Sequence, residues 1–184
     1  MAKKAKKAKL TTDEAMMAGH LPYELSMILS TLSVIGPWPP ALLGIQNALL
    51  ESCAIHQRIV IEFLKGENPN YPLTRFCRPG YTPSPHFVRR RHMTRINGHV
   101  AHLGRLRTDD QASKLSSKDL SQAAAGIFAE ARRFTSHLRP EWAEVVRRSE
   151  YWNPVRSMLA LPEVGLDGGQ GHHQGHVRDT DQDT

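Results

Sequence analysis

Residues Arg89–Arg107 read RRRHMTRINGHVAHLGRLR, and two sets of side chains recur in this stretch at helical spacing. The polar set falls on one side of a helix with about 3.6 residues per turn: His92, Arg95, His99 and His102. The apolar set follows one position later along the chain: Met93, Ile96, Val100 and Leu103. The stretch therefore predicts a helix from about Phe87 to Leu106, with one edge in a core and a neighbouring edge of histidine and arginine.

The composition is that of a globular protein. The chain has 184 residues, of which 40% are hydrophobic and 23% are charged, so a single domain with tails can bury a core without metals or disulfides. Its formal net charge of +6 favours a polyanionic partner. Several of the lysines lie in the first ten residues, so this charge alone does not identify the partner.

Helical periodicity accounts for the apolar runs, and no two runs are joined by a tight hairpin turn. Pro22 suits the first turn of a helix, Gly66 suits a helix end, and Ser116 with Asp119 suits a helix start. The sequence therefore predicts an all-α fold, an up-down bundle of four to five helices. The expected helices are Leu21–Val34, Ala41–Lys65, Phe87–Leu106, Leu120–His137 and Pro140–Arg148.

A long loop is expected between the second and third main helices, because residues 67–86 contain five prolines. Loops of this length in compact domains are uncommon and are often functional or disordered. Its aromatic side chains have two interpretations, anchoring the loop to the core or stacking on bases. They are Tyr71, Phe76 and Tyr81.

The chain divides by composition into a basic disordered tail (1–10), a helical domain (11–161) and a disordered polar tail (162–184). No secretory signal and no run of about 18 apolar residues is evident, so we expect no membrane partner. Cys53 and Cys77 lie in dissimilar surroundings and suggest no disulfide framework. Together these features predict a cytoplasmic protein.

Several kinds of catalytic site have no support in the sequence. Phosphate-binding glycine loops and the serine-hydrolase elbow motif do not occur. His92, His99 and His102 have spacings that suit a metal, but the Glu-x-x-His pairs of di-iron bundles are missing, so we expect no metal and no other cofactor.

Arginine and histidine on one helix face suit chemistry at a phosphodiester. A histidine can take a proton from a 2′-hydroxyl group or give one to the leaving oxygen, and an arginine can stabilise charge on the phosphate. The alternative is a hydrogen-bonded edge with a purely packing role. Glu51, on the polar side of the second helix, could orient a histidine or pair with Arg95, or it could form ordinary surface contacts.

The segment from Arg95 to His102, with six residues between the two, resembles the R-x(4–6)-H motif of the HEPN superfamily. The string NALLESCAIHQRIVIEFL from Asn47, RINGHVAHL from Arg95 and HLPYEL from His20 are similar to those of a bacterial HEPN-like group. The resemblance covers roughly residues 20–138. HEPN domains are small all-helical domains of toxins, phage-defence proteins and CRISPR effectors.

This resemblance implies a metal-independent endoribonuclease acting on single-stranded RNA in a toxin or phage-defence system. It implies a homodimer in which Arg95 and His102 of two subunits meet, with Asn97 as an orienting group. Whether His99 or His102 is the working imidazole stays open. Other HEPN domains are inactive, so the alternative is a non-catalytic helical interaction module of a defence or stress system, with an antitoxin protein as a further partner.

Gly98 and Gly104 lie inside the expected 87–106 helix. Each interior glycine costs about 0.5–1 kcal/mol relative to alanine, which suggests the close approach of another backbone. A second helix or a second subunit are the two expected neighbours.

Overall fold

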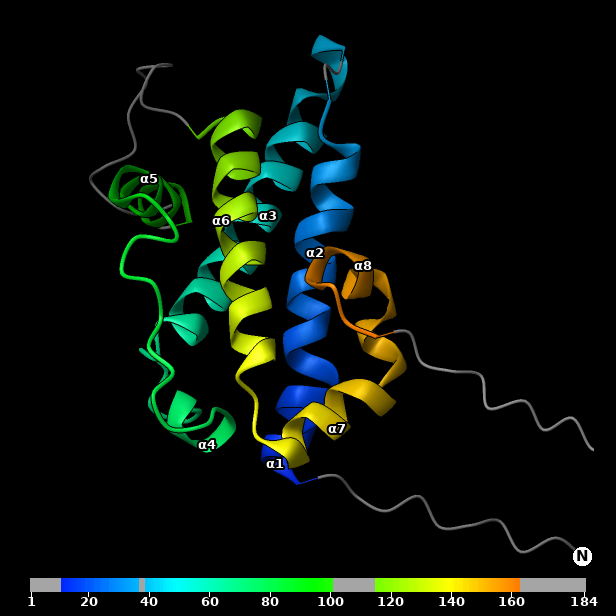
Figure 1. Cartoon of the computed structure of the whole chain (residues 1–184). Coiled ribbons are helices and arrows are strands. Elements are labelled where there is room, and N and C mark those ends of the chain that lie inside the picture. Colours follow the sequence, from blue (N-terminus) through cyan, green and yellow to red (C-terminus); the bar gives the residue numbers. More distant parts are fainter. Residues whose placement is uncertain (1–10, 37–38, 101–114, 163–184) are drawn as a thin grey trace, which may run out of the picture.

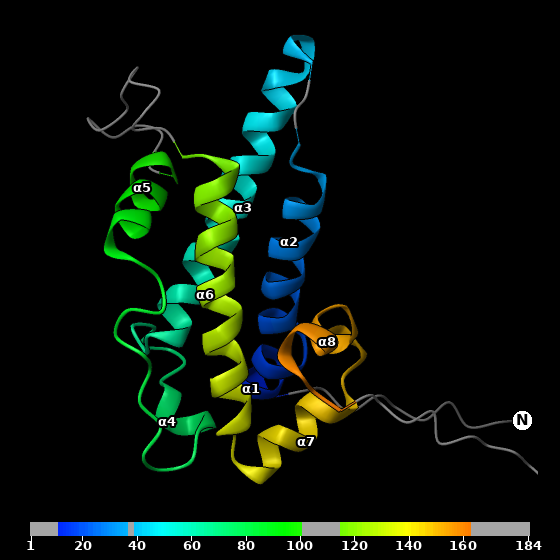
Figure 2. The same cartoon turned by 45° about the horizontal axis from the view of Figure 1, so that its top comes forward.

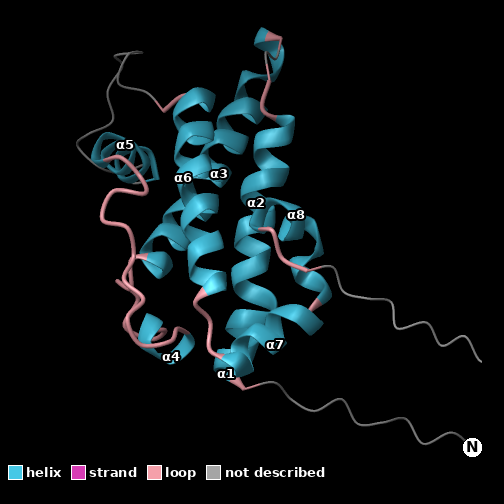
Figure 3. Cartoon of the chain, viewed as in Figure 1, coloured by secondary structure: helices cyan, strands magenta, loops and turns pink. Residues whose placement is uncertain are grey.

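Helices α2 (Leu21–Val34), α3 (Leu43–Leu64) and α6 (Ser117–Ser136) lie side by side and form the frame of the molecule (Figure 1). The computed structural model describes residues 11–36, 39–100 and 115–162, with only the backbone of residues 99–100. Across these ranges the chain forms helices and no strand, apart from an isolated bridge between Cys77 and Leu138 (Figure 3). The predicted all-α class is confirmed.

The long loop determines the directions of the helices. In Figure 1, α2 runs upward and α3 returns downward beside it, and Figure 2 shows the same antiparallel pair. The loop after α3 then carries the chain back up to α5 (Arg90–Val100), and α6 descends in the same direction as α3. Helix α5 is seen nearly end-on in Figure 1, so it crosses the frame, where it contacts α3 and α6.

Local sequence signals explain the helix boundaries. The observed bounds of α2 are the predicted ones. Pro22 occupies its first turn, where backbone N–H groups have no partner within the helix, so the N–H that proline lacks costs no hydrogen bond. A 3-10 turn, Pro40–Leu42, precedes α3, and α3 ends just before Gly66, which adopts a left-handed conformation (φ 73°). At the start of α6, Ser116 and Asp119 form a reciprocal capping box.

The remaining short elements pack on the lower part of the frame. Trp152 is fully buried and donates its Nε1–H to the carbonyl oxygen of Met17 at 2.8 Å, which fixes the C-terminal segment to the start of the chain. The short elements are α1 (Thr12–Ala15), a π-turn (Met16–His20), α4 (Leu73–Phe76), α7 (Pro140–Arg148), a 3-10 helix (Glu150–Val155) and α8 (Arg156–Leu159).

The core lies where α2, α3 and α6 face one another. Phe63 of α3 and Phe134 of α6 meet edge to face with ring centroids 5.4 Å apart, and both are buried. Fully burying one such side chain stabilises the fold by roughly 1.5–3 kcal/mol. Gln57 is also buried, and its Nε2 donates to the carbonyl oxygen of Leu120 at 2.8 Å, which ties α3 to the first turn of α6.

The aromatic residues of the long loop anchor it to the core, so the first of their two interpretations is confirmed. Phe76 is fully buried, with ring contacts to Phe63 and Trp142. The hydroxyl group of Tyr81 donates to Glu130 Oε1 at 2.7 Å, and Tyr71 is partly buried against the core.

Helix α5 starts at Arg90, three residues after the predicted start, because the preceding segment docks on α6 before it turns helical. A Cβ atom on Gly126 would lie 1.8 Å from the carbonyl oxygen of Phe87, so this backbone contact requires glycine. Val88 is buried beside it. The predicted end of the helix, the 1–10 tail and all of the 162–184 tail except Pro162 lie outside the described residues.

The predicted close approach at Gly98 is not seen within the described chain. A Cβ atom added there would meet no described heavy atom within 4 Å, and Gly104 lies outside the described residues. The close backbone contact is at Gly126 instead, which lies on α6. A second subunit as the neighbour of Gly98 stays a prediction.

Replacing these two glycines by alanine should have opposite effects. Gly126→Ala should lower the free energy of unfolding by about 1–3 kcal/mol, because the methyl group pushes Phe87 off α6. Gly98→Ala, in open space within a helix, should raise it by about 0.5–1 kcal/mol. Urea denaturation measures both, and two changes of equal sign and size would contradict the docked position of Phe87.

Candidate functional site

Asp119 is the carboxylate around which the polar edge of α5 is organised. Its Oδ2 accepts hydrogen bonds from the Ser116 backbone N–H at 3.2 Å, the Ser116 hydroxyl group at 2.7 Å and Arg95 Nη1 at 2.7 Å. Asp119 is buried. Burial raises its pKa, but the Ser116 hydrogen bonds and the Arg95 charge outweigh burial and hold the pKa below its usual range. The group is therefore an anion near neutral pH.

Arg95 is held by Asp119 and is partly exposed. Its guanidinium group binds Asp119 across the α5–α6 contact, while 33% of the side chain is exposed. A planar fork of N–H donors held in this way loses little conformational entropy when it binds an oxyanion. The arrangement suits a group that contacts an incoming phosphate in a fixed orientation.

His92 lies beneath the ion pair and is only 2% exposed. Its Nε2 lies 3.6 Å from Asp119 Oδ1 and 3.3 Å from Arg91 Nε, which donates to it. Burial is the main cause that lowers the His92 pKa, the Arg91 charge adds to it, and Asp119 opposes both. A neutral, buried imidazole packs and accepts a hydrogen bond here, and its burial separates it from a substrate on the surface.

The start of α5 carries a concentrated positive charge. Arg89, Arg90 and Arg91 are exposed, and the first turn of the helix contains no acidic residue. The N-terminal end of a helix is itself the positive end of the backbone dipole. With Arg95 one turn further on, this surface attracts polyanions, and we call Arg89, Arg90, Arg91 and Arg95 the arginine surface.

The structure describes the other predicted site residues to different extents. Asn97 is exposed on α5, and Glu51 is partly buried on α3, which α5 contacts. Whether Glu51 orients a histidine or pairs with Arg95 stays a prediction. Only the backbone of His99 is described, and His102 lies outside the described residues, so the choice between the two imidazoles and the expected lack of a metal are both untested.

Sequence reasoning assigned Asp119 only a capping role and missed its bond to Arg95. The Ser-x-x-Asp spacing does predict the capping box, but a contact between residues 24 positions apart has no local signal. His92 was grouped with Arg95 and His99 as one polar edge, yet it points into the contact between helices. Helical periodicity cannot distinguish a buried position from a partly exposed one here, because His92 lies next to the apolar set on the helix.

Comparison with known proteins gave no matching family model, and no curated protein or solved structure matched the chain. Within the described residues, no helix has both the length and the apolar character needed to cross a membrane.

The Arg95–Asp119 ion pair should contribute measurably to stability. Asp119→Asn removes the charge while keeping the shape, and it should lower the free energy of unfolding by about 1–2 kcal/mol, a value reduced because Arg95 is partly exposed. Asp13→Asn is the control, because Asp13 pairs with Arg75 at 3.2 Å at the surface and should change stability by less than about 0.5 kcal/mol. Equal losses on urea denaturation would contradict the role given to Asp119.

Proposed function

We propose that the chain is a metal-independent endoribonuclease that binds single-stranded RNA on the arginine surface of α5. The observation that supports this most is Arg95, which is held by the buried Asp119 and remains partly exposed among other arginines. The resemblance of Arg95–His102 to the R-x(4–6)-H motif of HEPN domains gives the reaction class. A toxin or phage-defence role is part of the same proposal.

The chemistry follows from the two side chains of the motif. The His102 imidazole removes the proton from a ribose 2′-hydroxyl group, whose oxygen attacks the adjacent phosphorus. The bond to the 5′-oxygen of the next nucleotide breaks, and that oxygen takes up a proton. Arg95 stabilises the charge that builds on the phosphate oxygens, and Asn97 orients the reacting groups. The products are a 2′,3′-cyclic phosphate and a 5′-hydroxyl end.

The site is proposed to be completed in a homodimer, where Arg95 of one subunit meets His102 of the other. Glu51 and His99 are the remaining candidates near this site. No described atom lies within 4 Å of a Cβ atom added to Gly98, and this supports the arrangement, because a second subunit could approach the helix closely there.

The purified chain should cleave a single-stranded RNA oligonucleotide in the presence of EDTA and leave 2′,3′-cyclic phosphate ends. DNA of the same sequence should survive, because it lacks the 2′-hydroxyl group. Arg95→Ala and His102→Ala should each slow cleavage by at least about 10²-fold. Arg148→Ala is the matched control, since Arg148 is exposed and pairs with Glu144 on α7, at the opposite end of the frame from α5 in Figure 1, and it should cleave like the parent.

Three results would revise this proposal in different ways. If Arg95→Ala and His102→Ala cleave like the parent, the activity belongs to a contaminant and the proposal fails. If His99→Ala is inactive while His102→Ala is active, His99 is the working imidazole. If RNA binds in a salt-dependent manner but is never cleaved, the non-catalytic alternative replaces the enzyme.

That alternative is a helical interaction module of a defence or stress system, and one observation favours it. Large apolar side chains are exposed along α2, the 3-10 turn before α3, and α3, where the start of α3 projects beyond its neighbours in Figure 2. Exposed apolar groups at this density are typical of surfaces that bind a partner, such as an antitoxin protein. They are Tyr23, Val34, Leu42, Leu43, Ile45, Ile55 and Ile59.

Sedimentation of matched variants distinguishes a dimer contact at Gly98 on α5 from a contact on the projecting part of α3. A dimer that forms the proposed catalytic site should dissociate in Gly98→Arg, which blocks the open face of α5, and persist in Ile45→Lys, on the projecting part of α3. Dissociation by Ile45→Lys alone would instead place the contact on α3. A parent protein that stays monomeric at micromolar concentration, with and without RNA, would contradict the composite site.

A further inference from the structure

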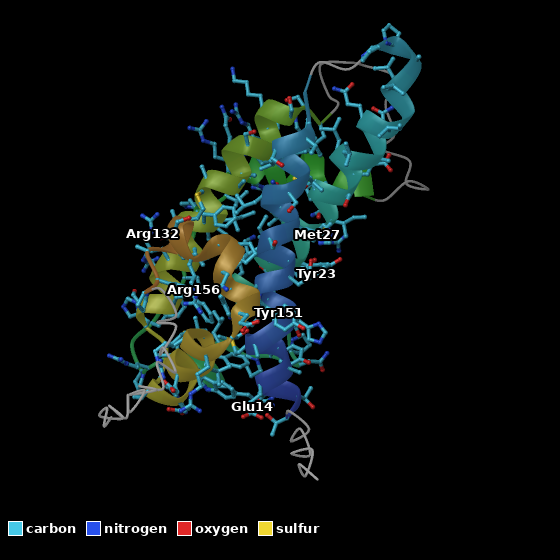
Figure 4. All side chains as sticks on the ribbon, turned by 90° about the vertical axis from the view of Figure 1, so that its right-hand side faces the viewer. Glu14, Tyr23, Met27, Arg132, Tyr151 and Arg156 are labelled. Atoms are coloured by element: carbon cyan, nitrogen blue, oxygen red, sulfur yellow. The ribbon has the colours of Figure 1, made fainter. Side chains whose placement is uncertain are left out.

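The lower end of the molecule contains a pocket that the proposed ribonuclease reaction does not use. It has a volume of about 550 Å³, which lies in the range of small-molecule sites. It lies between the C-terminal half of α6, α7 and the α8 segment. Arg132 and Arg156, which both line it, are on the same side of the molecule in Figure 4.

Apolar side chains form most of the pocket wall. Two of them, Val146 and Leu159, are nearly fully buried, and the backbone turn at Ala160 (φ 51°) places Leu159 and Leu161 in the same wall. Such a wall favours a ligand with an apolar body. The apolar lining residues are Leu138, Pro140, Ala143, Val146, Leu159, Ala160, Leu161 and Pro162.

Arg156 is a buried cation at this pocket, with only 5% of its surface exposed. Its guanidinium group donates to the Asn153 side-chain oxygen and to the carbonyl oxygens of Pro162, Val146, Arg147 and Ser149. All of these acceptors are neutral, and no carboxylate pairs with Arg156 among the described residues. The C-terminal end of α7 offsets only part of the charge, since a helix end carries about half an elementary charge.

Arg132 adds a second positive charge at the rim. The only hydrogen bond that its guanidinium group makes among the described residues goes to the carbonyl oxygen of Met158 at 2.7 Å. The acid that lines the pocket, Glu144, is already bound by Arg147 and Arg148. Within the described part of the chain, the pocket therefore combines an apolar wall with two cations that no acidic side chain neutralises. Arg132 is exposed at the rim, whereas the charge of Arg156 is buried and compensated only by neutral acceptors, so a nearby anion would stabilise it.

We propose that this pocket binds a small amphipathic carboxylate, with its anionic group near Arg156 and Arg132 and its apolar body against Val146 and Leu159. A carboxylate fits better than a phosphate monoester, because a doubly charged group loses more hydration on entering an apolar pocket. The site is independent of the proposed ribonuclease reaction: Thr135, which lines the pocket, lies on α6 about 24 Å along the helix from Asp119.

Titration of the full chain with 4-phenylbutyrate, followed by two-dimensional NMR, tests this proposal. A typical ligand efficiency gives a probe of this size a Kd of about 2 mM. We expect binding at this level or tighter, at least about fivefold weaker binding of the neutral 4-phenylbutanol, and weaker binding of phenyl phosphate.

Two pairs of variants locate the probe. Ala143→Phe should abolish binding by filling the pocket from an exposed position, whereas Glu141→Phe places the same ring on α7 outside the pocket and should bind like the parent. Arg132→Gln should weaken binding of the carboxylate about fivefold and leave the alcohol unchanged. Arg133→Gln, next to it but outside the lining, should have no effect on either probe.

Several results would overturn the proposal. They are no binding of any probe at 10 mM, equal binding of the acid and the alcohol, and unchanged binding in Ala143→Phe. Tighter binding of phenyl phosphate than of 4-phenylbutyrate would overturn the choice of a carboxylate. None of these results bears on RNA cleavage, so the two proposals fail or succeed separately.

Discussion

The carboxylate of Asp119 is the interaction on which the arrangement of α5 depends. It closes the N-terminal end of α6 through Ser116, and it holds Arg95 from the crossing helix. A buried carboxylate is stable only when hydrogen bonds and a positive charge compensate its lost hydration, so the cap and the ion pair support each other. Phe87, docked against Gly126 further along α6, adds a second attachment. The arginine surface is therefore carried on a helix fixed at two places.

The two buried ions near α6 have different surroundings, and this difference separates the two proposed sites. Asp119 is a buried anion compensated by a cation of the same chain, so its charge is balanced without a ligand. Arg156 is a buried cation whose partners in residues 11–36, 39–100 and 115–162 are all neutral, so its pocket retains a positive charge there that an anion can compensate. The first arrangement holds the Arg95 side chain in a fixed orientation, and the second favours the binding of an anion.

The helical frame could be predicted from the sequence because its signals are local. Proline and glycine near Leu21 and Leu64 and the capping box at Ser116 mark helix ends within a few residues of chain. The start of α5 was predicted three residues early, because tertiary contact of Phe87 with α6 overrides local helical pattern. No local signal identifies such a contact before the fold is known.

The candidate site could be predicted only in part from such local sequence signals. Arg95 was selected from its spacing, and its catalytic role stays a prediction; the structure adds that it is partly exposed on a basic helix. Its partner Asp119 and the buried position of His92 depend on how α5 crosses α6, which periodicity does not encode. The pocket around Arg156 has no sequence signature either, because its wall combines residues from α6, α7 and α8 that share no motif.

The most direct test of the account is a double-mutant cycle on single-turnover RNA cleavage, using the parent, Asp119→Asn, Arg95→Lys and the double variant. The account holds that Asp119 acts on the reaction only by positioning Arg95. Asp119→Asn should therefore slow cleavage by about tenfold, and the double variant should cleave no more slowly than Arg95→Lys alone. A parental rate in Asp119→Asn, or rate losses that multiply in the double variant, would contradict the account.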